Sequence, residues 1–281
     1  MKKFLWLLMI QCLWSMPVFS EALDVQLLRS ISTPVAVKQM ATTADGKTIY
    51  LLLNNGAIQL RGADGQLEGS FDAGADVIDM EVLGTNRLLL KMKDNQELLI
   101  VGLRPRVQIS TQESPTLGPS SAVVTIAVFD DFQCPYCSKL VEPLKVVLDK
   151  YPEQVRLVFK NFPLTMHQHA RIAATAGLAA QKQGEFWPLH DLMFANYRQL
   201  TPEKIRKLAE TLPLDMDRFE ADINDPALGR RIDSDIREGK SIGVRGTPTL
   251  FINGRRVQKR SVEEMSRMIN EELARLTGAK S

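Results

Sequence analysis

Two cysteines three positions apart, Cys134 and Cys137, are the residues of this 281-residue chain best suited to chemistry. They follow an apolar run typical of a buried strand, 122–129, and begin a stretch with helical periodicity, 138–150. Three residues make about one helical turn, so both sulfurs lie on one face of the helix and can close a small disulfide. This setting predicts a redox-active pair.

The two thiols are expected to differ in role. Cys134 lies at the predicted helix N-terminus, where unpaired backbone N–H groups and the helix dipole stabilise an anion. We expect its thiolate to have a pKa of about 3.5 to 7.5 and to act as the nucleophile. Cys137 is more shielded from water and would resolve a mixed disulfide by attacking Cys134. Pro135 suits the first helical turn, and Tyr136 is expected to tune the reduction potential.

The same Cys-x-x-Cys spacing also occurs as half of many zinc sites. A zinc site would need two further ligands. The remaining cysteine, Cys12, lies in the N-terminal apolar run, and the three histidines lack zinc-like spacing relative to the pair (His167, His169 and His190). The sequence therefore predicts a redox pair with no metal and no cofactor other than its own disulfide.

A second motif far downstream extends this prediction, because Gly246-Thr247-Pro248-Thr249 leads into a short apolar strand, 250–252. Residues 120–281 resemble the DsbA-like thioredoxin-fold proteins of the bacterial periplasm. The resemblance rests on that motif and on four others: Phe129-Asp130-Asp131-Phe132, Cys134-Pro135-Tyr136-Cys137, Phe159-Lys160-Asn161-Phe162-Pro163-Leu164 and Gly184-Glu185-Phe186-Trp187.

The resemblance implies an α/β thioredoxin fold with an inserted helical block and a cis peptide bond at Thr247–Pro248. In such proteins the loop with the proline lies beside the disulfide and binds an extended substrate through backbone groups, which makes Thr247 and Pro248 the candidate substrate-binding residues. It also implies a protein thiol-disulfide oxidoreductase that acts on thiols or disulfides of other proteins and has a membrane redox partner.

The direction of the reaction is left open by the sequence. Thr247, where simple oxidases of the resembled family often have Val, and the additional N-terminal domain favour a disulfide isomerase or reductase. A monomer-like dithiol oxidase is the alternative. A Cu(I)-binding module is another, because two thiolates suit Cu(I), although the methionines do not cluster near the cysteine pair.

The chain departs from the family pattern in its proton chemistry. Family members often carry a buried acid six residues before the first cysteine, and this chain has Val128 there. Lys160, on the next predicted strand, is a candidate substitute for that acid. Asp131 matches an acid common in the family at its place, where it either takes part in the chemistry or only stabilises the turn. His167 and His169 are expected near the rim of the site or at a helix cap.

Residues 1–20 are predicted to be a secretory signal peptide, because Lys2 and Lys3 precede an apolar run, 4–13, that is too short to span a membrane. Removal of this segment leaves two cysteines, both in the redox motif. An exported protein with a single Cys-x-x-Cys pair is suited to disulfide exchange in an oxidising compartment. We therefore expect a periplasmic protein.

Residues 21–110 are predicted to form a small all-β domain, because short apolar or alternating runs are separated by turn signals. A shift of 40 residues superposes similar residues in the two halves: Val37 on Val77, Met40 on Met80, Ile58 on Leu98 and Leu60 on Ile100. This period is typical of β-propeller blades; a small sandwich or meander is the alternative. Two blades would leave apolar surface and edge strands exposed, so we expect homo-oligomerisation through this domain, as a trimer or dimer.

Residues 111–121 are polar and contain two prolines and a glycine, which predicts an interdomain linker before the thioredoxin domain, 122–281. Within that domain the patterns predict a second parallel strand, 155–159, and a terminal helix, 261–276. The inserted helices are expected at 168–183, 186–197, 201–212, 216–224 and 226–240. The net charge of +2 argues against nucleic acid as a partner.

Overall fold

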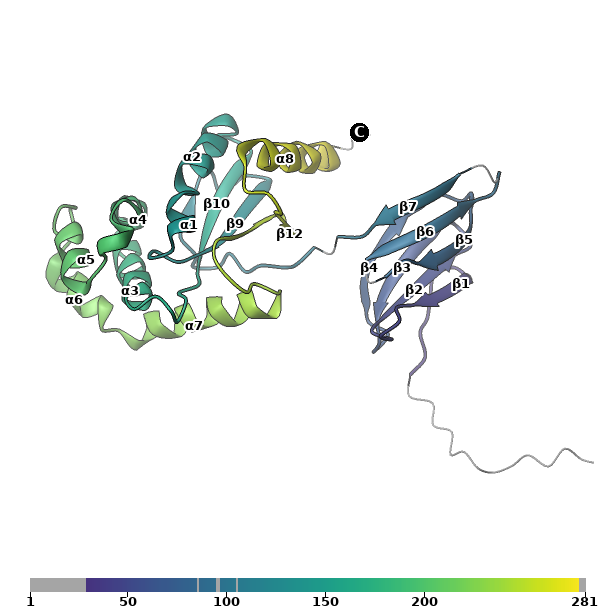
Figure 1. Ribbon diagram of the computed structural model, residues 1–281, viewed down its shortest axis with the longest axis horizontal. Coiled ribbons are helices and arrows are strands. Elements are labelled where there is room, and N and C mark those ends of the chain that lie inside the picture. The colour runs from purple at the N-terminus through teal and green to yellow at the C-terminus, as the bar shows by residue number, and fades with distance from the viewer. Residues whose placement is uncertain (1–28, 85, 95–96, 105, 278–281) are drawn as a thin grey trace, which may run out of the picture. The chain divides into compact units, whose positions relative to one another are not determined.

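The computed structural model describes residues 29–277, except 85, 95, 96 and 105. The chain divides into two compact units, one ending at Leu103 and one beginning at Arg104 (Figure 1). The predicted signal peptide lies outside the described residues. Within them, no helix has both the length and the apolar character needed to cross a membrane.

The N-terminal unit is all-β, as predicted. Its strands form two antiparallel sheets with the orders β1-β2-β3-β4 and β5-β6-β7. The strands are β1 (Val37–Thr42), β2 (Thr48–Leu53), β3 (Ala57–Gly62), β4 (Leu67–Asp72), β5 (Val77–Val82), β6 (Arg87–Met92) and β7 (Leu98–Gly102). Both sheets contribute to one core, which includes Tyr50, Leu52 and Ile58 from the first sheet and Met80 and Leu88 from the second.

The 40-residue repeat is visible in this unit. β5 begins 40 residues after β1, and both strands carry a bulge at their second residue, where the pairing shifts after Val37 and after Val77. Gln39 joins the two sheets, because its side chain exchanges two hydrogen bonds with the backbone of Met80, at 2.7 and 2.9 Å. No closed sheet forms among the described residues, so the propeller-blade interpretation remains a prediction.

The sequence analysis missed β4, which pairs with β3. Its sequence, Leu67-Glu68-Gly69-Ser70-Phe71-Asp72, has a glycine and two acids, which are poor strand formers, so its pattern did not indicate a strand. Along the part of the chain that the structure describes, β7 has no equivalent of β4 beside it.

The second unit is built on a five-stranded sheet with the order β12-β11-β9-β10-β8. Its strands are β8 (Thr116–Leu117), β9 (Val124–Asp130), β10 (Val155–Asn161), β11 (Thr249–Ile252) and β12 (Arg255–Arg256). β9 is central, as predicted, and pairs parallel with β10 and antiparallel with β11. Its alternate residues serve two cores, since Ile126 faces one cluster and Phe129 faces another.

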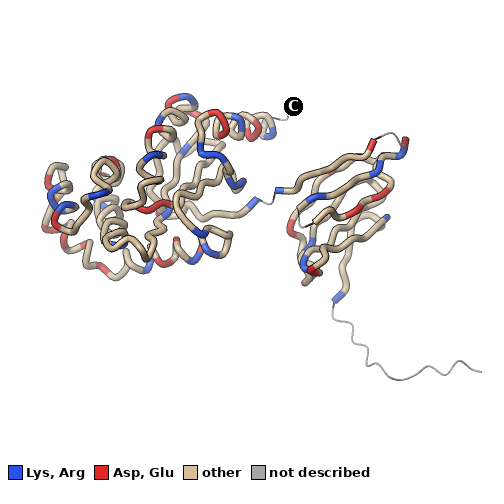
Figure 2. Tube along the Cα trace, viewed as in Figure 1, with Lys and Arg blue, Asp and Glu red and all other residues tan. Residues whose placement is uncertain are grey.

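Helices cover both faces of this sheet (Figure 1). α2 (Val141–Lys150) and α8 (Val262–Thr277) lie on one face, and α7 (Pro226–Ser241) lies on the other. The predicted helical block is present as α3 (Ala170–Gln181), α4 (Phe186–Ala195), the 3-10 turn η1 (Tyr197–Gln199), α5 (Pro202–Ala209) and α6 (Met216–Ile223). Thr201 caps α5, because its hydroxyl accepts the N–H of Lys204 at 3.2 Å. Figure 2 marks both basic and acidic residues along α5 and α6.

The helix predicted to begin at the cysteines is divided into two helices. A short helix, α1 (Pro135–Ser138), ends before Lys139, and α2 begins at Val141. Pro143 explains the break, because it cannot donate a hydrogen bond to the carbonyl of Lys139 and its ring crowds that group.

The segment predicted as a linker belongs to the second unit. β8 lies within it and pairs antiparallel with β10 at the edge of the sheet, with Leu117 opposite Leu157. Immediately before it, Ser110 O accepts a hydrogen bond from Lys160 Nζ at 3.1 Å. The boundary between the units therefore precedes the predicted linker. Polar, proline-containing sequence indicates irregular backbone, but it does not reveal whether that backbone is bonded to a sheet edge.

Candidate active site

The turn that follows β9 places the cysteine pair at the start of α1. Cys134 is the N-cap residue, with extended backbone angles (φ −79°, ψ 122°), and Pro135 takes the first helical position, as the sequence predicted. The carbonyl of Cys134 accepts the N–H groups of Cys137 and Ser138 at 3.1 and 3.2 Å. The first cysteine is therefore held where the unpaired N–H groups of the helix converge.

The structure brings the second motif against the first. The Thr247–Pro248 peptide bond is cis, as the resemblance implied. Cys134 Sγ lies 3.6 Å from the carbonyl oxygen of Thr247, 113 positions away in the chain. Cys134 is 3% exposed and Cys137 is fully buried, whereas Tyr136 between them is 64% exposed. One sulfur is thus at the edge of the surface, next to the backbone of the proline loop, and the other is beneath it.

The surroundings stabilise the thiolate of Cys134. Its pKa is lowered to about 5, first because the Cys137 thiol hydrogen-bonds to it, and then through the Thr247 side chain and the N–H groups of Cys137 and Tyr136. Burial opposes this effect. The pKa of Cys137 is strongly raised, mainly by burial, and its hydrogen bond to Cys134 and the charge of Asp130 add to the increase. The two thiols therefore have opposite protonation preferences.

Asp130 is a site residue that the sequence analysis did not select. It is the last residue of β9, it is buried, and its Oδ1 atom has no hydrogen-bond partner. Its side chain is within hydrogen-bonding reach of the Cys137 thiol. Burial raises the pKa of Asp130 to about 7, with contributions from the charges of Cys134 and Asp131. A signal for it was available, because residues two apart on a strand share a face, and Asp130 is two residues after Val128.

Lys160 does not replace the acid that is missing at Val128, and that interpretation is wrong. Lys160 pairs in register with Phe129, so its side chain lies on the other face of the sheet. There it is buried, and its Nζ atom is 2.6 Å from Asp235 Oδ1 and 2.9 Å from Glu238 Oε2, both on α7. This cation fixes α7 to the sheet.

Asp131 organises the turn before the cysteines. Its Oδ1 accepts the N–H of Gln133 at 2.8 Å, and its Oδ2 accepts the N–H of Leu164 and contacts His167 Nδ1, both at 2.8 Å. Asp131 thus joins the active-site turn to the loop after β10. His169 occupies the N-cap position of α3, and its side chain makes no capping bond.

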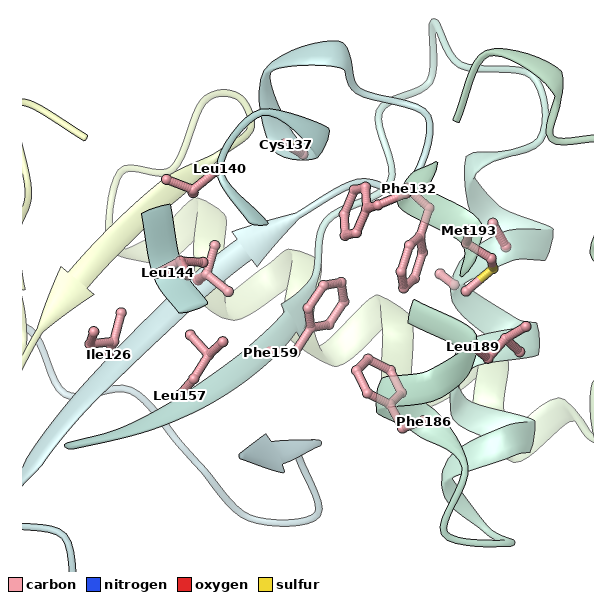
Figure 3. Close-up of a cluster of buried hydrophobic side chains, with 14 of the residues drawn as sticks. Ile126, Phe132, Cys137, Leu140, Leu144, Leu157, Phe159, Phe186, Leu189 and Met193 are labelled. Carbon is pink, nitrogen blue, oxygen red and sulfur yellow. The ribbon is translucent and has the colours of Figure 1, made fainter. Parts of the chain in front are cut away.

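Aromatic side chains support the turn from within the domain (Figure 3). The ring of Phe132 stacks on Phe159 at a centroid distance of 5.1 Å and packs against Phe186, Phe194 and His190. Figure 3 places Cys137 next to this cluster. Such packing restricts the positions that Cys137 can take. Within the described ranges, no group of three or more histidine, cysteine, aspartate or glutamate side chains could hold a metal ion.

Comparison with known proteins agrees with this geometry. A family model described as thioredoxin (Thioredoxin_4) matches residues 110–271, more than half of the chain. The chain belongs to this thioredoxin family. The probable disulfide bond formation protein D of Bacillus cereus is 30% identical to this chain over 176 residues, which cover 58% of this chain and 80% of that protein. The predicted resemblance to DsbA-like thiol-disulfide oxidoreductases is confirmed.

Other relatives are much longer proteins. The Na(+)/H(+) antiporter NhaA 3 of Salinispora tropica is 39% identical over 151 residues, which cover 53% of this chain and 23% of the antiporter. The chain thus spans about a quarter of the length of the curated antiporters that it matches.

Solved structures show the thioredoxin-like fold with its helical insertion. Oxidised BdbD of Bacillus subtilis has a TM-score of 0.55 and 22% identity and covers 60% of this chain and 98% of its own. The catalytic domain of Proteus mirabilis ScsC has a TM-score of 0.51 and 20% identity, with 58% and 90% covered.

Proposed function

We propose that this chain is a periplasmic protein thiol-disulfide oxidoreductase that uses the Cys134–Cys137 pair and acts as a disulfide isomerase or reductase. The observation that carries the proposal is the pairing of a stabilised thiolate at Cys134 with a buried, protonated thiol at Cys137, beside the Thr247 carbonyl. An attacking group and a resolving group are thereby separated within one helical turn.

The reaction proceeds through a mixed disulfide. The Cys134 thiolate attacks one sulfur of a substrate disulfide, and the other substrate sulfur leaves as a thiolate. Cys137 then loses its proton and attacks Cys134, which releases the second substrate sulfur and leaves the Cys134–Cys137 disulfide. In an isomerisation, a substrate thiol instead attacks the mixed disulfide and regenerates the Cys134 thiolate. A membrane redox partner would keep the pair in the working state.

The loop of Thr247 and Pro248 is the proposed substrate-binding segment. Extended peptides bind sheet edges through backbone hydrogen bonds, and the Thr247 carbonyl lies next to the reacting sulfur. Tyr136 offers an exposed aromatic ring beside the same sulfur, where it can pack against apolar substrate side chains. Together they suit a loosely folded polypeptide.

Assembly through the N-terminal unit supports the isomerase interpretation, because several active sites held together suit a bulky misfolded substrate. Leu98 and Ile100 of β7 are exposed, as is Met40 of β1. Apolar side chains on an edge strand are an unusual feature of a monomer. We propose that a second copy of this chain covers them.

A refolding assay tests the function. The full mature chain is incubated in a glutathione buffer with a protein substrate that carries wrong disulfides, and recovery of substrate activity is measured. Recovery is expected with the native chain and not with Cys134→Ser. If neither recovers the substrate and the oxidised chain instead rapidly oxidises a reduced substrate, the isomerase proposal is wrong.

Dithiol oxidation is the second candidate function, and the low pKa of Cys134 favours it. A stabilised thiolate favours the reduced form of the pair and makes its disulfide more oxidising. The reduction potential separates the two functions, since about −120 mV is typical of a dedicated oxidase and about −180 mV of a protein disulfide isomerase. Redox titration in glutathione buffers measures it.

A further inference from the structure

The two sheets of the N-terminal unit differ at their outer edges. In the first sheet, β4 is the fourth strand and covers the outer edge of β3. The second sheet repeats β1, β2 and β3 as β5, β6 and β7, and within the part of the chain that the structure describes it ends at β7 (Figure 1). One edge of β7 therefore presents backbone N–H and C=O groups with no strand beside them. An open edge of this kind readily accepts a further strand.

The 40-residue repeat would place the missing fourth strand at residues 107–112, which follow β4 by 40 positions. Those residues belong to the second unit instead. The N–H of Val107 donates to the carbonyl of Gly254 at 3.0 Å, and the carbonyl of Ser110 accepts from Lys160 Nζ at 3.1 Å. Because they are bonded there, these residues are not free to pair with β7.

The same repeat, followed in the other direction, gives a fourth strand that has no sheet. Residues 27–32 precede β4 by 40 positions, and three matched pairs are identical or apolar in both segments. These pairs are Leu27 with Leu67, Ser30 with Ser70 and Ile31 with Phe71. Four residues separate β4 from β5, and four separate residue 32 from β1. The described part of the segment, 29–32, belongs to no strand, and Ile31 is 39% exposed.

The chain that leads into β1 runs on the side of the first sheet that faces away from the second. The carbonyl of Ser32 accepts a hydrogen bond from Arg61 of β3 at 3.3 Å. Arg61 is three residues after Ile58, whose side chain lies in the core between the sheets, so Arg61 is on the opposite face. β7 lies on the core side, where Val101 packs. The segment is thus directed towards a neighbouring molecule and not towards the β7 of its own chain.

We propose that residues 27–32 of one copy pair antiparallel with the open edge of β7 in a second copy and complete its sheet as the fourth strand. This pairing rests on the function proposed above, of which assembly is a part, and names the segment that makes the contact. β4 supplies the pattern, because it runs antiparallel to β3 with Phe71 opposite Ile58. The equivalent contact places Ile31 of the donor near Leu98 of β7, which is 63% exposed.

Addition of a strand accounts for two exposed features at once. It bonds the edge backbone of β7, and it covers apolar side chains of both partners. The contact is head-to-tail, since the donor segment and the accepting edge are different surfaces of the chain, and such contacts close into rings. A closed ring uses every donor segment and every open β7 edge. The predicted signal peptide ends at residue 20, so the donor segment stays in the mature chain.

Isotope-coded photocrosslinking tests the occupant of the edge. The photoreactive residue p-benzoylphenylalanine replaces Ile31 in the full mature chain, and unlabelled copies are mixed with copies labelled with heavy nitrogen. Mass spectrometry then maps the products. We expect cross-links from position 31 to residues 98–102 that join an unlabelled copy to a labelled one. The same probe in place of the exposed turn residue Lys47 is the control and should give no cross-link to β7.

Proline substitution tests the strand pairing. Adjacent residues of a strand donate their N–H groups in opposite directions, so either Ser30→Pro or Ile31→Pro removes a hydrogen bond to β7. That variant should raise the dissociation constant of the assembly by roughly tenfold or more, measured by light scattering over a dilution series. Ser30→Ala and Ile31→Val keep both N–H groups and serve as matched controls with the native dissociation constant.

The outcomes separate this pairing from the redox function. Cross-links between position 31 and β7 within one copy would overturn the exchange between copies, as would native assembly of both proline variants. A monomeric native chain would overturn this pairing together with the proposed assembly. Disulfide exchange by Cys134 is measured in the same samples. Its absence from the native chain would contradict the proposed oxidoreductase, while cross-links between copies would still support the strand exchange.

Discussion

The pKa values of Cys134 and Cys137 are shifted in opposite directions, although the two side chains are identical and lie one helical turn apart. The first receives hydrogen bonds from its neighbours, and its pKa falls to about 5. The second is enclosed by apolar surface, and its pKa rises. The difference arises from burial and from the direction of hydrogen bonds, which follow from the position of each residue in the turn.

The protonation of Cys134 can be tested by alkylation. Its rate of reaction with iodoacetamide should be half-maximal at a pH of about 5 and nearly constant from pH 6 to pH 8. An ordinary thiol would gain reactivity continuously over that range. Cys137→Ala, measured alongside, removes the second thiol from the signal but also one hydrogen bond, so its midpoint should be higher.

The same shift makes the stability of the reduced protein depend on pH. The folded-state pKa of Cys134 is below its ordinary value of 9.0, so the stabilisation is fully present above pH 9. It decreases with falling pH and is lost at about pH 5. Chemical denaturation of the reduced chain at pH 5 and pH 8 should show higher stability at pH 8, whereas Cys134→Ser should lose most of this difference.

Substitution of each cysteine distinguishes their roles. Cys134→Ser should abolish exchange, because the thiolate nucleophile is removed. Cys137→Ser should accumulate mixed disulfides with protein substrates, because Cys134 still attacks and no second thiol resolves the product. Non-reducing gels detect these adducts. Turnover by Cys134→Ser would show that the roles are assigned wrongly.

At this scale, the sequence predicted the cysteine pair and the proline loop that the structure brings together, but not Asp130. The spacing of the cysteines is a local signal, and the Gly246-Thr247-Pro248-Thr249 motif carries its own conformational constraint. Asp130 stands beside a second acid, Asp131, and only the structure separates them. One points at a buried thiol and the other binds a loop.

Elements far apart in the chain are joined by buried ion pairs. Glu272 of α8 is almost fully buried and contacts three arginines: Arg106 at 2.7 Å, Arg255 at 3.0 Å and Arg275 at 3.2 Å. Burial acts to raise the pKa of Glu272, but these contacts outweigh it and lower the pKa to about 2. Through them α8 holds both β12 and the first residues of the second unit.

Glu272→Gln should destabilise the second unit by about 3 kcal/mol, because removing one member of a buried ion-pair network leaves the others unpaired. Urea denaturation monitored by tryptophan fluorescence measures the change. Glu264→Gln, on the surface of the same helix, provides the matched control and should have little effect. Equal stability of both variants would show that the arginines find other partners.

Element boundaries were predictable where local chemistry marks them. Thr201 and Pro202 mark the start of α5, and Pro143 marks the break before α2. β8 and β4 were missed because each is defined by its partner strand rather than by its own side chains. Short edge strands carry little periodicity, so their pairing has to be observed.

At the scale of the whole molecule, the exposed apolar side chains of the N-terminal unit favour assembly with a second copy of the chain. Light scattering of the mature chain should give a mass of two or three copies. Ile100→Asp with Leu98→Asp should reduce that mass to one copy, because charges on β7 would oppose pairing of edge strands. Lys91→Asp, on the neighbouring strand, is the control. A monomeric native chain would contradict assembly and weaken the isomerase proposal.

The docking of residues 106–117 has a practical consequence for modular engineering. These residues form hydrogen bonds with β10, with the turn before β12 and with α8. They are therefore part of the second unit and cannot serve as a spacer. A chimera that joins this redox unit to another carrier should therefore be cut near residue 104. A cut at 121 would remove the edge strand β8 and the contact of Arg106 with Glu272. The transferred unit would therefore be less stable than the native one.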